Sequence, residues 1–295
     1  MLPRQVLPRQ FYLVTRRCSQ RQFLLRPDPA TNNAFVYCLI DAALRCKVDV
    51  LLPCAMSNHY HAVIYDREGR YPEFIEHLHK MLARSQNALR GRWENFWSSE
   101  QTCVVKLIDR DAVIDKLVYT ATNPVLDDLV DRVHHWPGTN GLVALLAGRP
   151  LRARRPAHFF RANGPMPETV ELPLAIPPEL GPAAELLSEL RERVRAVESE
   201  HAAERLRTGG RVLGRRAVLA QSWRSFPTSR EPRRNFRPQV AGRSKWARME
   251  ALLRNRSFVV EYADARSRWR DGVPALFPPG TYWLRRFAAV SALGA

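Results

Sequence analysis

The first half of the chain alternates between two spacings of apolar residues. Short apolar runs rich in strand formers are separated by segments in which apolar residues recur every three or four positions, as on one face of a helix. Turn-forming residues at 26–29 and 66–69 interrupt the pattern. The expected elements, in order, are a strand at 11–15, a helix at 32–46, strands at 48–54 and 59–65, a helix at 72–89, a strand at 102–108 and a helix at 111–122.

This order of elements predicts an α+β fold. The βαββαβ arrangement over residues 11–108 is the ferredoxin-like one, an antiparallel sheet with two helices packed on one face. The opposite face is then free to carry a site. The helix at 111–122 follows this unit as an additional element.

Beyond residue 137 the texture of the sequence changes. Residues 138–182 are rich in Pro, Gly and Arg and read as a linker or arm, whereas 183–295 form a basic, mostly helical or irregular extension. We therefore divide the chain into residues 1–137, 138–182 and 183–295. Helices are expected at 185–207 and 244–270. In the last helix the candidate buried positions are Trp246, Met249, Leu253 and Val260.

The composition adds a strong positive charge to this picture. The chain has 46 lysines and arginines against 29 aspartates and glutamates, a formal net charge of +17, with 45% apolar residues. Such an excess on a folded chain is typical of proteins that bind polyanions, most often nucleic acids. A basic protein of the membrane surface is the competing interpretation, but no uncharged apolar run is long enough to span a bilayer.

Clustered arginines are the candidate contacts to phosphate groups. Any one of them, taken alone, is more often a solvated surface charge. Nearby rings of Trp223, Phe226 and Phe236 either stack on bases or anchor this part of the chain to the rest. The clusters are Arg16, Arg17 and Arg21; Arg152, Arg154 and Arg155; and Arg211, Arg215, Arg216, Arg233 and Arg234.

Two His-x-His pairs differ in their expected secondary structure. His59 and His61 lie on a predicted strand, where side chains two positions apart point to the same face, so that they can chelate a single ion. His77 and His79 lie in a predicted helix, where the same spacing turns them about 200° apart. This second pair cannot share a metal and is expected at the surface.

A second candidate feature is the pair Tyr119 and Asn123. Four residues apart on a helix is one turn, so the two side chains share a face. Pro124 disfavours helical geometry at the residue before it, which predicts that the helix ends or kinks there and that the Asn123 amide projects from a helix end. A half-buried tyrosine before a helix-terminating Asn-Pro is the alternative that the spacing alone favours.

Both features together resemble one family. Residues 56–61 (MSNHYH), followed by apolar 62–64, and residues 119–125 (YTATNPV) are similar to the motifs of the single-tyrosine HUH transposases. The segment 91–97 (GRWENFW) resembles the branch associated with repetitive extragenic palindromes (REP). The resemblance spans about residues 9 to 137. It departs from the family at Tyr60, where a bulky apolar residue is usual, and the part from 138 is not shared by the minimal members.

The resemblance implies a metal-dependent enzyme that cleaves and rejoins hairpin-forming single-stranded DNA without ATP. Tyr119 would be the nucleophile that forms a 5′-phosphotyrosine link, and His59, His61 and Asn123 would hold Mg²⁺ or Mn²⁺. It implies a transposition or recombination function, with a monomer or homodimer acting on the DNA. The arginine clusters, including Arg215 and Arg216, would contact the phosphates.

Two other functions remain open from the sequence. The ferredoxin-like fold also serves RNA-recognition modules, which stack bases on aromatic residues two positions apart on central strands. Here that strand offers two histidines, with Tyr60 facing the other way. The other alternative is a host-adapted or catalytically idle nucleic-acid-binding protein that retains the same fold.

The cysteines and the N-terminus bear on the compartment. The five cysteines include no C-x-x-C pair and are expected to be reduced, mostly buried thiols, so a structural zinc site is not predicted. The first residues lack the apolar stretch of a signal peptide. These features predict a cytoplasmic protein that does not enter the membrane and associates with the nucleoid through DNA.

Overall fold

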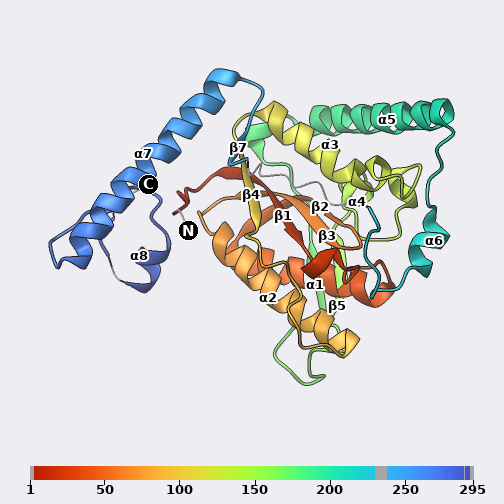
Figure 1. Ribbon diagram of the computed structural model, residues 1–295, viewed down its shortest axis with the longest axis horizontal. Helices are drawn as coiled ribbons and strands as arrows, with labels where there is room; N and C mark the ends of the chain where they lie inside the picture. The colour runs from red at the N-terminus through yellow and green to blue at the C-terminus, as the bar shows by residue number, and fades with distance from the viewer. Residues whose placement is uncertain (1–2, 230–237, 289, 293–295) are drawn as a thin grey trace.

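The elements expected over the first 122 residues are all present in the computed structural model (Figure 1), each close to its predicted bounds. The structure describes residues 3–229, 238–288 and 290–292. The elements of this part are β1 (Gln10–Arg17), α1 (Pro29–Cys46), β2 (Val48–Ala55), β3 (His59–Asp66), α2 (Tyr71–Arg90), β4 (Cys103–Leu107) and α3 (Arg110–Leu126), with a short 3-10 turn η1 (Ser19–Arg21) after β1.

The strands form one five-stranded sheet in the order β2-β3-β1-β4-β7. β1 pairs antiparallel with both β3 and β4, and β2 pairs antiparallel with β3. The fifth strand, β7 (Val240–Ala241), pairs parallel with β4 and makes the sheet mixed. The α+β class is therefore confirmed. A two-residue strand has no periodicity to detect, so β7 was not predicted.

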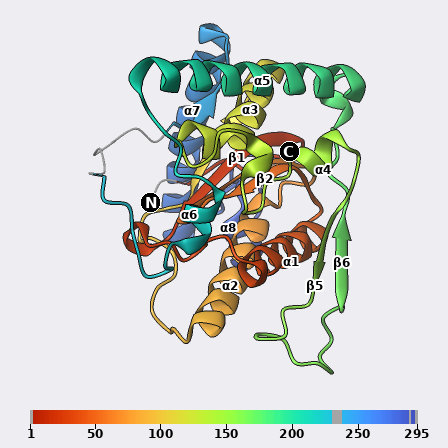
Figure 2. The ribbon, with the colours of Figure 1, turned by 90° about the vertical axis from the view of Figure 1, so that its right-hand side faces the viewer.

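Helices cover both faces of the sheet (Figures 1 and 2). Alternating side chains of β1 show the division: Tyr12 and Val14 point into the core formed with α1 and α2, whereas Leu13 points into the core formed with α3. The expectation of a free opposite face is wrong, because the apolar side chains on that face of the strands are buried by α3 and by a later helix, α5 (Ala183–Thr208).

The chain beyond residue 126 packs back onto this body. On α5, Leu186, Leu190 and Val194 join the core under α3, and the β5–β6 hairpin lies on α1 (Figure 2). Contacts thus cross the predicted boundary at residue 137, and the division of the chain into domains stays a prediction. The elements are η2 (Val133–His135), α4 (Leu142–Leu146), β5 (Leu151–Arg154), β6 (Thr169–Leu172), η3 (Pro178–Leu180), α5, α6 (Arg215–Ala220), α7 (Lys245–Arg270) and α8 (Trp283–Phe287).

The long helix α7 extends along one side of the body with most of its surface exposed (Figure 1). Its buried residues are Phe258 and Ala265. The predicted buried positions are wrong, because the narrow face of α7 that meets the rest of the chain is a different one from its apolar stripe. The exposed fractions are 76% for Trp246, 43% for Met249, 59% for Leu253 and 64% for Val260.

The helix α3 does not end at Asn123. It continues through Pro124 to Leu126, so the prediction of a helix end before the proline is wrong. The missing N–H of Pro124 deprives only one carbonyl near the end of the helix of its partner, while the Asn123 carbonyl still accepts from Asp127 N at 3.1 Å. The Asn123 side chain consequently lies inside the protein, 4% exposed, and does not project from a terminus.

The second histidine pair diverges, but it does not lie freely at the surface as predicted. His77 Nε2 lies 2.6 Å from Asp41 Oδ2. His79 packs against Trp97, and its Nε2 is hydrogen-bonded to the Tyr60 hydroxyl at 2.7 Å. Tyr60 itself is fully buried on the α1 and α2 face of the sheet. The tyrosine between the two strand histidines thus faces away from them, as the strand period predicts.

The burial of His79 has a consequence for acid stability. Burial, with a smaller contribution from Arg16, lowers the pKa of His79 to about 3, whereas an unfolded histidine titrates near 6.5. Above pH ~6.5 the neutral ring contributes its full stability. As the pH falls from ~6.5 towards 3 the unfolded state takes up the proton first, so stability is lost by up to about 1.4 kcal/mol per pH unit.

We expect His79→Gln, which cannot titrate, to flatten this part of the stability profile. Urea unfolding of both proteins at pH 8 and pH 5 measures it. At pH 8 the free energy of unfolding should be lower for the variant than for the wild type. At pH 5 the difference between the two proteins should be much smaller. A gap of equal size at both pH values would contradict a buried neutral His79.

The five cysteines are free thiols, four of them buried, which confirms that expectation. Among the described residues, no helix is long and apolar enough to cross a membrane.

Candidate active site

His59 and His61 lie side by side on β3, facing α3. Their ring centroids are 4.8 Å apart. His59 is half-buried at the first position of the strand, and His61 is 5% exposed. The strand period therefore predicts correctly that the two rings share a face.

Tyr119 and Asn123 approach this pair from α3. The Tyr119 ring centroid is 5.2 Å from that of His61, and its side chain is 37% exposed. Asn123, one turn further along the helix, is buried beneath it. The structure thus brings all four residues together, with the phenol at the surface and the other groups below it.

Two atoms of this cluster that could ligate a metal are buried without a hydrogen-bond partner among the described residues. They are Nε2 of His61 and Oδ1 of Asn123. An unsatisfied buried nitrogen or oxygen is costly unless a ligand completes it. Within the described part of the chain no three His, Cys, Asp or Glu side chains gather as a metal site. A metal here would therefore need the amide oxygen as its third protein ligand, and the two unsatisfied atoms fit that requirement.

Both imidazoles are held in the neutral form that a metal ligand requires. Burial lowers the pKa of His59 to about 4; Asn123 opposes the shift and Arg17 adds to it. Burial also lowers the pKa of His61 well below its usual value, with further contributions from His59 and Lys116. Neither ring carries a charge near neutral pH, so their nitrogen lone pairs are available.

A threonine on the neighbouring strand fixes the His61 ring. Thr15 pairs with His61 across β1 and β3, and its Oγ1 lies 2.7 Å from His61 Nδ1. A lone pair at Nε2 requires the proton at Nδ1, which then donates to Thr15 Oγ1. Thr15 thereby selects the tautomer that presents Nε2 to the cluster.

We expect Thr15→Val to reduce Mn²⁺ affinity by about 10–100-fold, because the loss of a group that orients a metal-ligating histidine has effects of this size. Isothermal titration with Mn²⁺ measures it, and Thr15→Ser, which keeps the hydroxyl, should bind like the wild type. Equal affinity of the valine variant would show that Thr15 does not orient the ring.

Two further residues of this site, Thr15 and Lys116, were not predicted from the sequence. The Lys116 ammonium lies 5.5 Å from the centroid of the Tyr119 ring, one turn earlier on α3. This cation–π contact places a positive charge over the ring of the candidate nucleophile. The signal for Lys116 was present as an i, i+3 spacing to Tyr119, whereas Thr15 is placed by strand register and had no sequence signal.

The first arginine cluster adjoins the site at the end of β1. Arg17 lies opposite His59 in the strand pairing. Arg16 points to the other face of the sheet, where its guanidinium donates to backbone carbonyls of Ser98 and Glu100. Arg21 donates to the carbonyl of Ser229 at 2.6 Å. Of the three, Arg17 is the one that the structure brings to the histidines.

The second cluster lies around the β5–β6 hairpin on α1, across the sheet from Tyr119, so the structure does not bring it to the site. Arg152 pairs with Glu171 at 2.9 Å. Arg154 is exposed. The Arg155 guanidinium donates to the carbonyls of Met166 and Gly164.

Part of the third cluster follows a segment that contacts the chain just beyond the end of α3. Exposed Arg215 and Arg216 begin α6, directly after Leu213 and Gly214, whose N–H groups donate to the carbonyls of Asp128 and Leu129 just beyond α3. Arg211 is exposed as well, whereas Arg233, Arg234 and Phe236 lie outside the described residues.

The aromatic residues of this region divide between two roles. Trp223 packs against the core under α1, with the guanidinium groups of Arg90 and Arg224 over its ring. It therefore anchors the segment to the body. Phe226 is 64% exposed, so most of its ring is open to solvent.

Comparison with known proteins adds two structures. No protein-family model and no curated protein matches the chain. A REP-associated tyrosine transposase bound to a REP hairpin is 15% identical, with 50% of this chain and 85% of that one covered and a TM-score of 0.43. A candidate transposase from Deinococcus radiodurans R1 is 16% identical, with 36% and 84% covered and a TM-score of 0.29. Structural similarities of this extent do not assign an activity to the chain. A functional proposal therefore has to rest on the residues of the site.

Proposed function

We propose that this chain cleaves and rejoins hairpin-forming single-stranded DNA by transesterification, with Tyr119 as the nucleophile. The observation that carries the proposal is the position of the half-exposed Tyr119 ring 5.2 Å from the ring of His61, above the two unsatisfied buried donors of His61 and Asn123. A nucleophile beside a ready-made cation site is the arrangement that phosphoryl transfer needs.

His59, His61 and Asn123 would hold a divalent cation, Mg²⁺ or Mn²⁺. Two imidazole nitrogens and an amide oxygen are a mixed ligand set of the kind that Mn²⁺ accepts, whereas Mg²⁺ prefers oxygen ligands. When bound, the cation polarises the scissile phosphate and offsets charge that develops on its oxygens. Thr15 keeps the His61 ring in the orientation that the site requires.

The bond changes assigned to Tyr119 balance without an external energy source. A new bond forms between the phenol oxygen and phosphorus, and the bond between phosphorus and the 3′ oxygen of the upstream nucleotide breaks. The phenol proton leaves to solvent, and the departing 3′ oxygen takes up a proton. The products are a 5′-phosphotyrosine and a 3′-hydroxyl, and the reverse attack by that hydroxyl rejoins the strand without ATP.

The surroundings of the site support DNA as the partner. Arg17 lies opposite His59 and Lys116 lies over the Tyr119 ring, and the exposed Arg215 and Arg216 begin α6, whose preceding residues contact the chain just beyond α3. The proposal also treats the strands β4-β1-β3-β2, with α1 and α2 on one face, as a ferredoxin-like core, and the antiparallel pairings of β1 with β3 and β4 support this. Transposition or recombination would be the biological use of such chemistry.

Incubation with a hairpin oligonucleotide labelled at either end, in Mn²⁺, tests the function. We expect a free upstream fragment and a downstream fragment that migrates with the protein, and neither product in EDTA. Binding without cleavage across a range of hairpins would instead favour a catalytically idle DNA-binding protein.

A further inference from the structure

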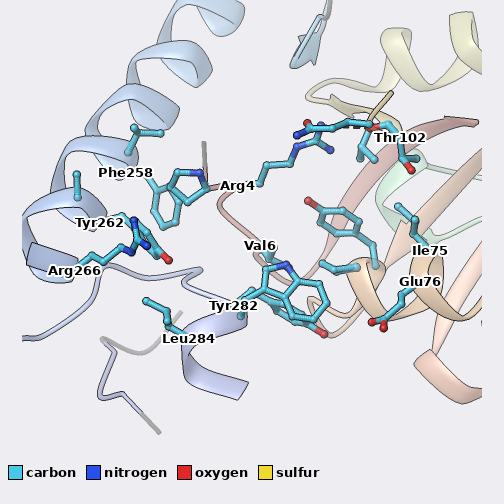
Figure 3. Close-up of a pocket in the computed structure, with 18 of the residues that line it drawn as sticks. Arg4, Val6, Ile75, Glu76, Thr102, Phe258, Tyr262, Arg266, Tyr282 and Leu284 are labelled. Carbon is cyan, nitrogen blue, oxygen red and sulfur yellow. Dashed lines mark hydrogen bonds between the residues drawn. The ribbon is translucent and has the colours of Figure 1, made fainter. Parts of the chain in front are cut away.

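A large cleft separates α7 and α8 from the body of the protein. Arg16 lines it from the face of the sheet opposite to the one that carries the catalytic residues. The volume of the cleft is about 1230 Å³. Figure 3 shows Phe258, Tyr262 and Arg266 on the α7 side, with Ile75 of α2 on the other. Small-molecule sites are commonly of about 300–1,000 Å³. The size and the two-walled shape suit a longer ligand.

The two walls are joined at the base of the cleft by specific contacts. Val6 N donates to the carbonyl of Gly280 at 3.0 Å, and the Tyr282 hydroxyl donates to Glu73 Oε1 at 2.5 Å. Gly280 has a φ of +86°, and a Cβ atom there would lie 2.5 Å from the Gln5 side chain, so only glycine fits this crossing. The cleft is thus held by the folded chain on both sides.

Positive charge lines the cleft on both walls. α7 carries seven basic side chains against three acidic ones. Arg266 and Arg270 from α7 line the cleft opposite Arg4, and within the described part of the chain neither α7 arginine forms an ion pair. The acidic lining residues are Glu76, Glu100 and Asp271. Glu100 faces Arg16, and within the described residues no ion pair joins Glu76 or Asp271 to either α7 arginine, so both arginines are available to an anionic ligand.

An exposed aromatic surface lies at the base of the cleft. Trp283 lines it and is 46% exposed, and its ring stacks on that of Phe287 with centroids 5.5 Å apart and planes 14° apart. Rings that serve only as anchors are buried in this region, as Phe258 and Phe277 are. A half-exposed indole that lines the same cleft as these arginines is instead the combination that holds single strands, with bases on the ring and phosphates on the cations.

The cleft leads to the end of β1 that lies beside the histidines of β3. Arg16 lines the cleft, and the next residue, Arg17, points to the opposite face of the sheet, where it lies opposite His59. A DNA strand that leaves the cleft at Arg16 therefore reaches the catalytic face by passing around the end of β1.

We propose that this cleft binds the single-stranded DNA that flanks the cleaved hairpin, with bases stacked on Trp283 and phosphates on Arg266 and Arg270. This inference rests on the proposed function, because it identifies the flank of that substrate as the ligand. The cleft adds affinity and directs the flank towards Tyr119, while the chemistry stays with the residues of β3 and α3.

Binding of two oligonucleotides by the full-length chain in EDTA tests the inference, since no cleavage is expected there. One is a hairpin with a ten-nucleotide single-stranded flank, and the other is the same hairpin without it. We expect Trp283→Ala to weaken binding of the flanked hairpin by roughly fivefold or more, since stacking on an aromatic residue contributes this much per base. Binding of the blunt hairpin should not change, and Trp283→Phe should restore the flanked one.

The charge contribution is measured across a salt series. Arg266→Ala/Arg270→Ala should reduce the slope of log K against log salt by about 1.4 for the flanked hairpin, because each single-strand phosphate contact contributes about 0.7. The matched control is Arg191→Ala/Arg195→Ala, two exposed arginines with the same spacing on α5, a helix of the same length as α7. It should leave the slope unchanged.

Equal effects of the two arginine pairs, or of Trp283→Ala on both oligonucleotides, would overturn the cleft as a binding site for the flank. Failure of the proposed function is seen separately, because it requires a wild-type chain that binds DNA and does not cleave it in Mn²⁺. Cleft variants that bind the flanked hairpin like the wild type, in a chain that cleaves, would overturn this inference alone.

Discussion

Tyr119→Phe is expected to reduce DNA cleavage by on the order of 10³-fold or more while leaving hairpin binding intact. The substitution removes the oxygen that would attack phosphorus, and loss of a nucleophile abolishes most of the acceleration in enzymes that act through one. The ring itself stays, so its contacts with His61 and Lys116 are kept. Single-turnover cleavage of a labelled hairpin in Mn²⁺, with binding measured in parallel, determines the loss.

The control for this prediction is Tyr65→Phe. Tyr65 lies on β3 on the same face as the two histidines, and its hydroxyl donates to Glu179. That variant should cleave like the wild type. A Tyr119→Phe protein that still cleaves would remove Tyr119 from the mechanism.

His61→Ala should reduce Mn²⁺ affinity by more than about 100-fold, the upper end of the cost of losing a group that merely orients a ligand. It removes the nitrogen Nε2 that is buried without a partner, and metal-dependent cleavage should fall with the metal. His59→Ala should act in the same direction. Metal binding is measured by isothermal titration, so the result does not depend on finding a cleavable DNA.

His77→Ala is the matched control, since it removes a half-buried histidine from the His-x-His pair on α2. It should bind Mn²⁺ like the wild type. His79 is unsuited to this use because it is packed on Tyr60 and Trp97, so its removal would disturb the fold. Similar losses from His61→Ala and His77→Ala would mean that the strand pair holds no metal.

The first seven elements could be predicted because each has a local pattern, either a short apolar run, as in β2 and β3, or a helical spacing of apolar residues. Strand and helix periods are local properties, and they locate β3 and α3 without knowledge of what the two elements contact. The covering of the second sheet face could not be predicted in the same way. It depends on the packing of α5 on α3, and α5 begins more than fifty residues after α3 ends.

In the candidate site, too, the local patterns could be predicted from the sequence and the tertiary contacts could not. The shared face of His59 and His61 follows from the strand period, and that of Tyr119 and Asn123 from the helix period. Their meeting is a tertiary contact that the sequence signals only through resemblance to a family. Thr15 lies opposite His61 by the register of β1 and β3, which no local pattern encodes.

Rules for single residues failed where the surroundings outweighed them. The proline rule placed a helix end at Asn123, but α3 continues for three further residues and buries the amide. The apolar stripe on α7 predicted buried positions that remain exposed, Trp246 among them. Burial of a helix face depends on which other element reaches it, and α7 is met by the rest of the chain along only a narrow face.

The most direct test of Tyr119 as the nucleophile is to locate the covalent link. The wild-type chain is incubated with a hairpin oligonucleotide in Mn²⁺, the adduct is isolated and digested with trypsin and nuclease, and the modified peptide is sequenced by mass spectrometry. Cleavage after Lys116 and Arg132 yields a peptide in which Tyr119 is the only tyrosine, whereas Tyr60 and Tyr65 lie together in the peptide that follows Lys47. We predict a nucleotide-phosphate on the peptide of residues 117–132. Its presence on the peptide of residues 48–67, or DNA cleavage with no linked peptide, would contradict Tyr119 as the nucleophile.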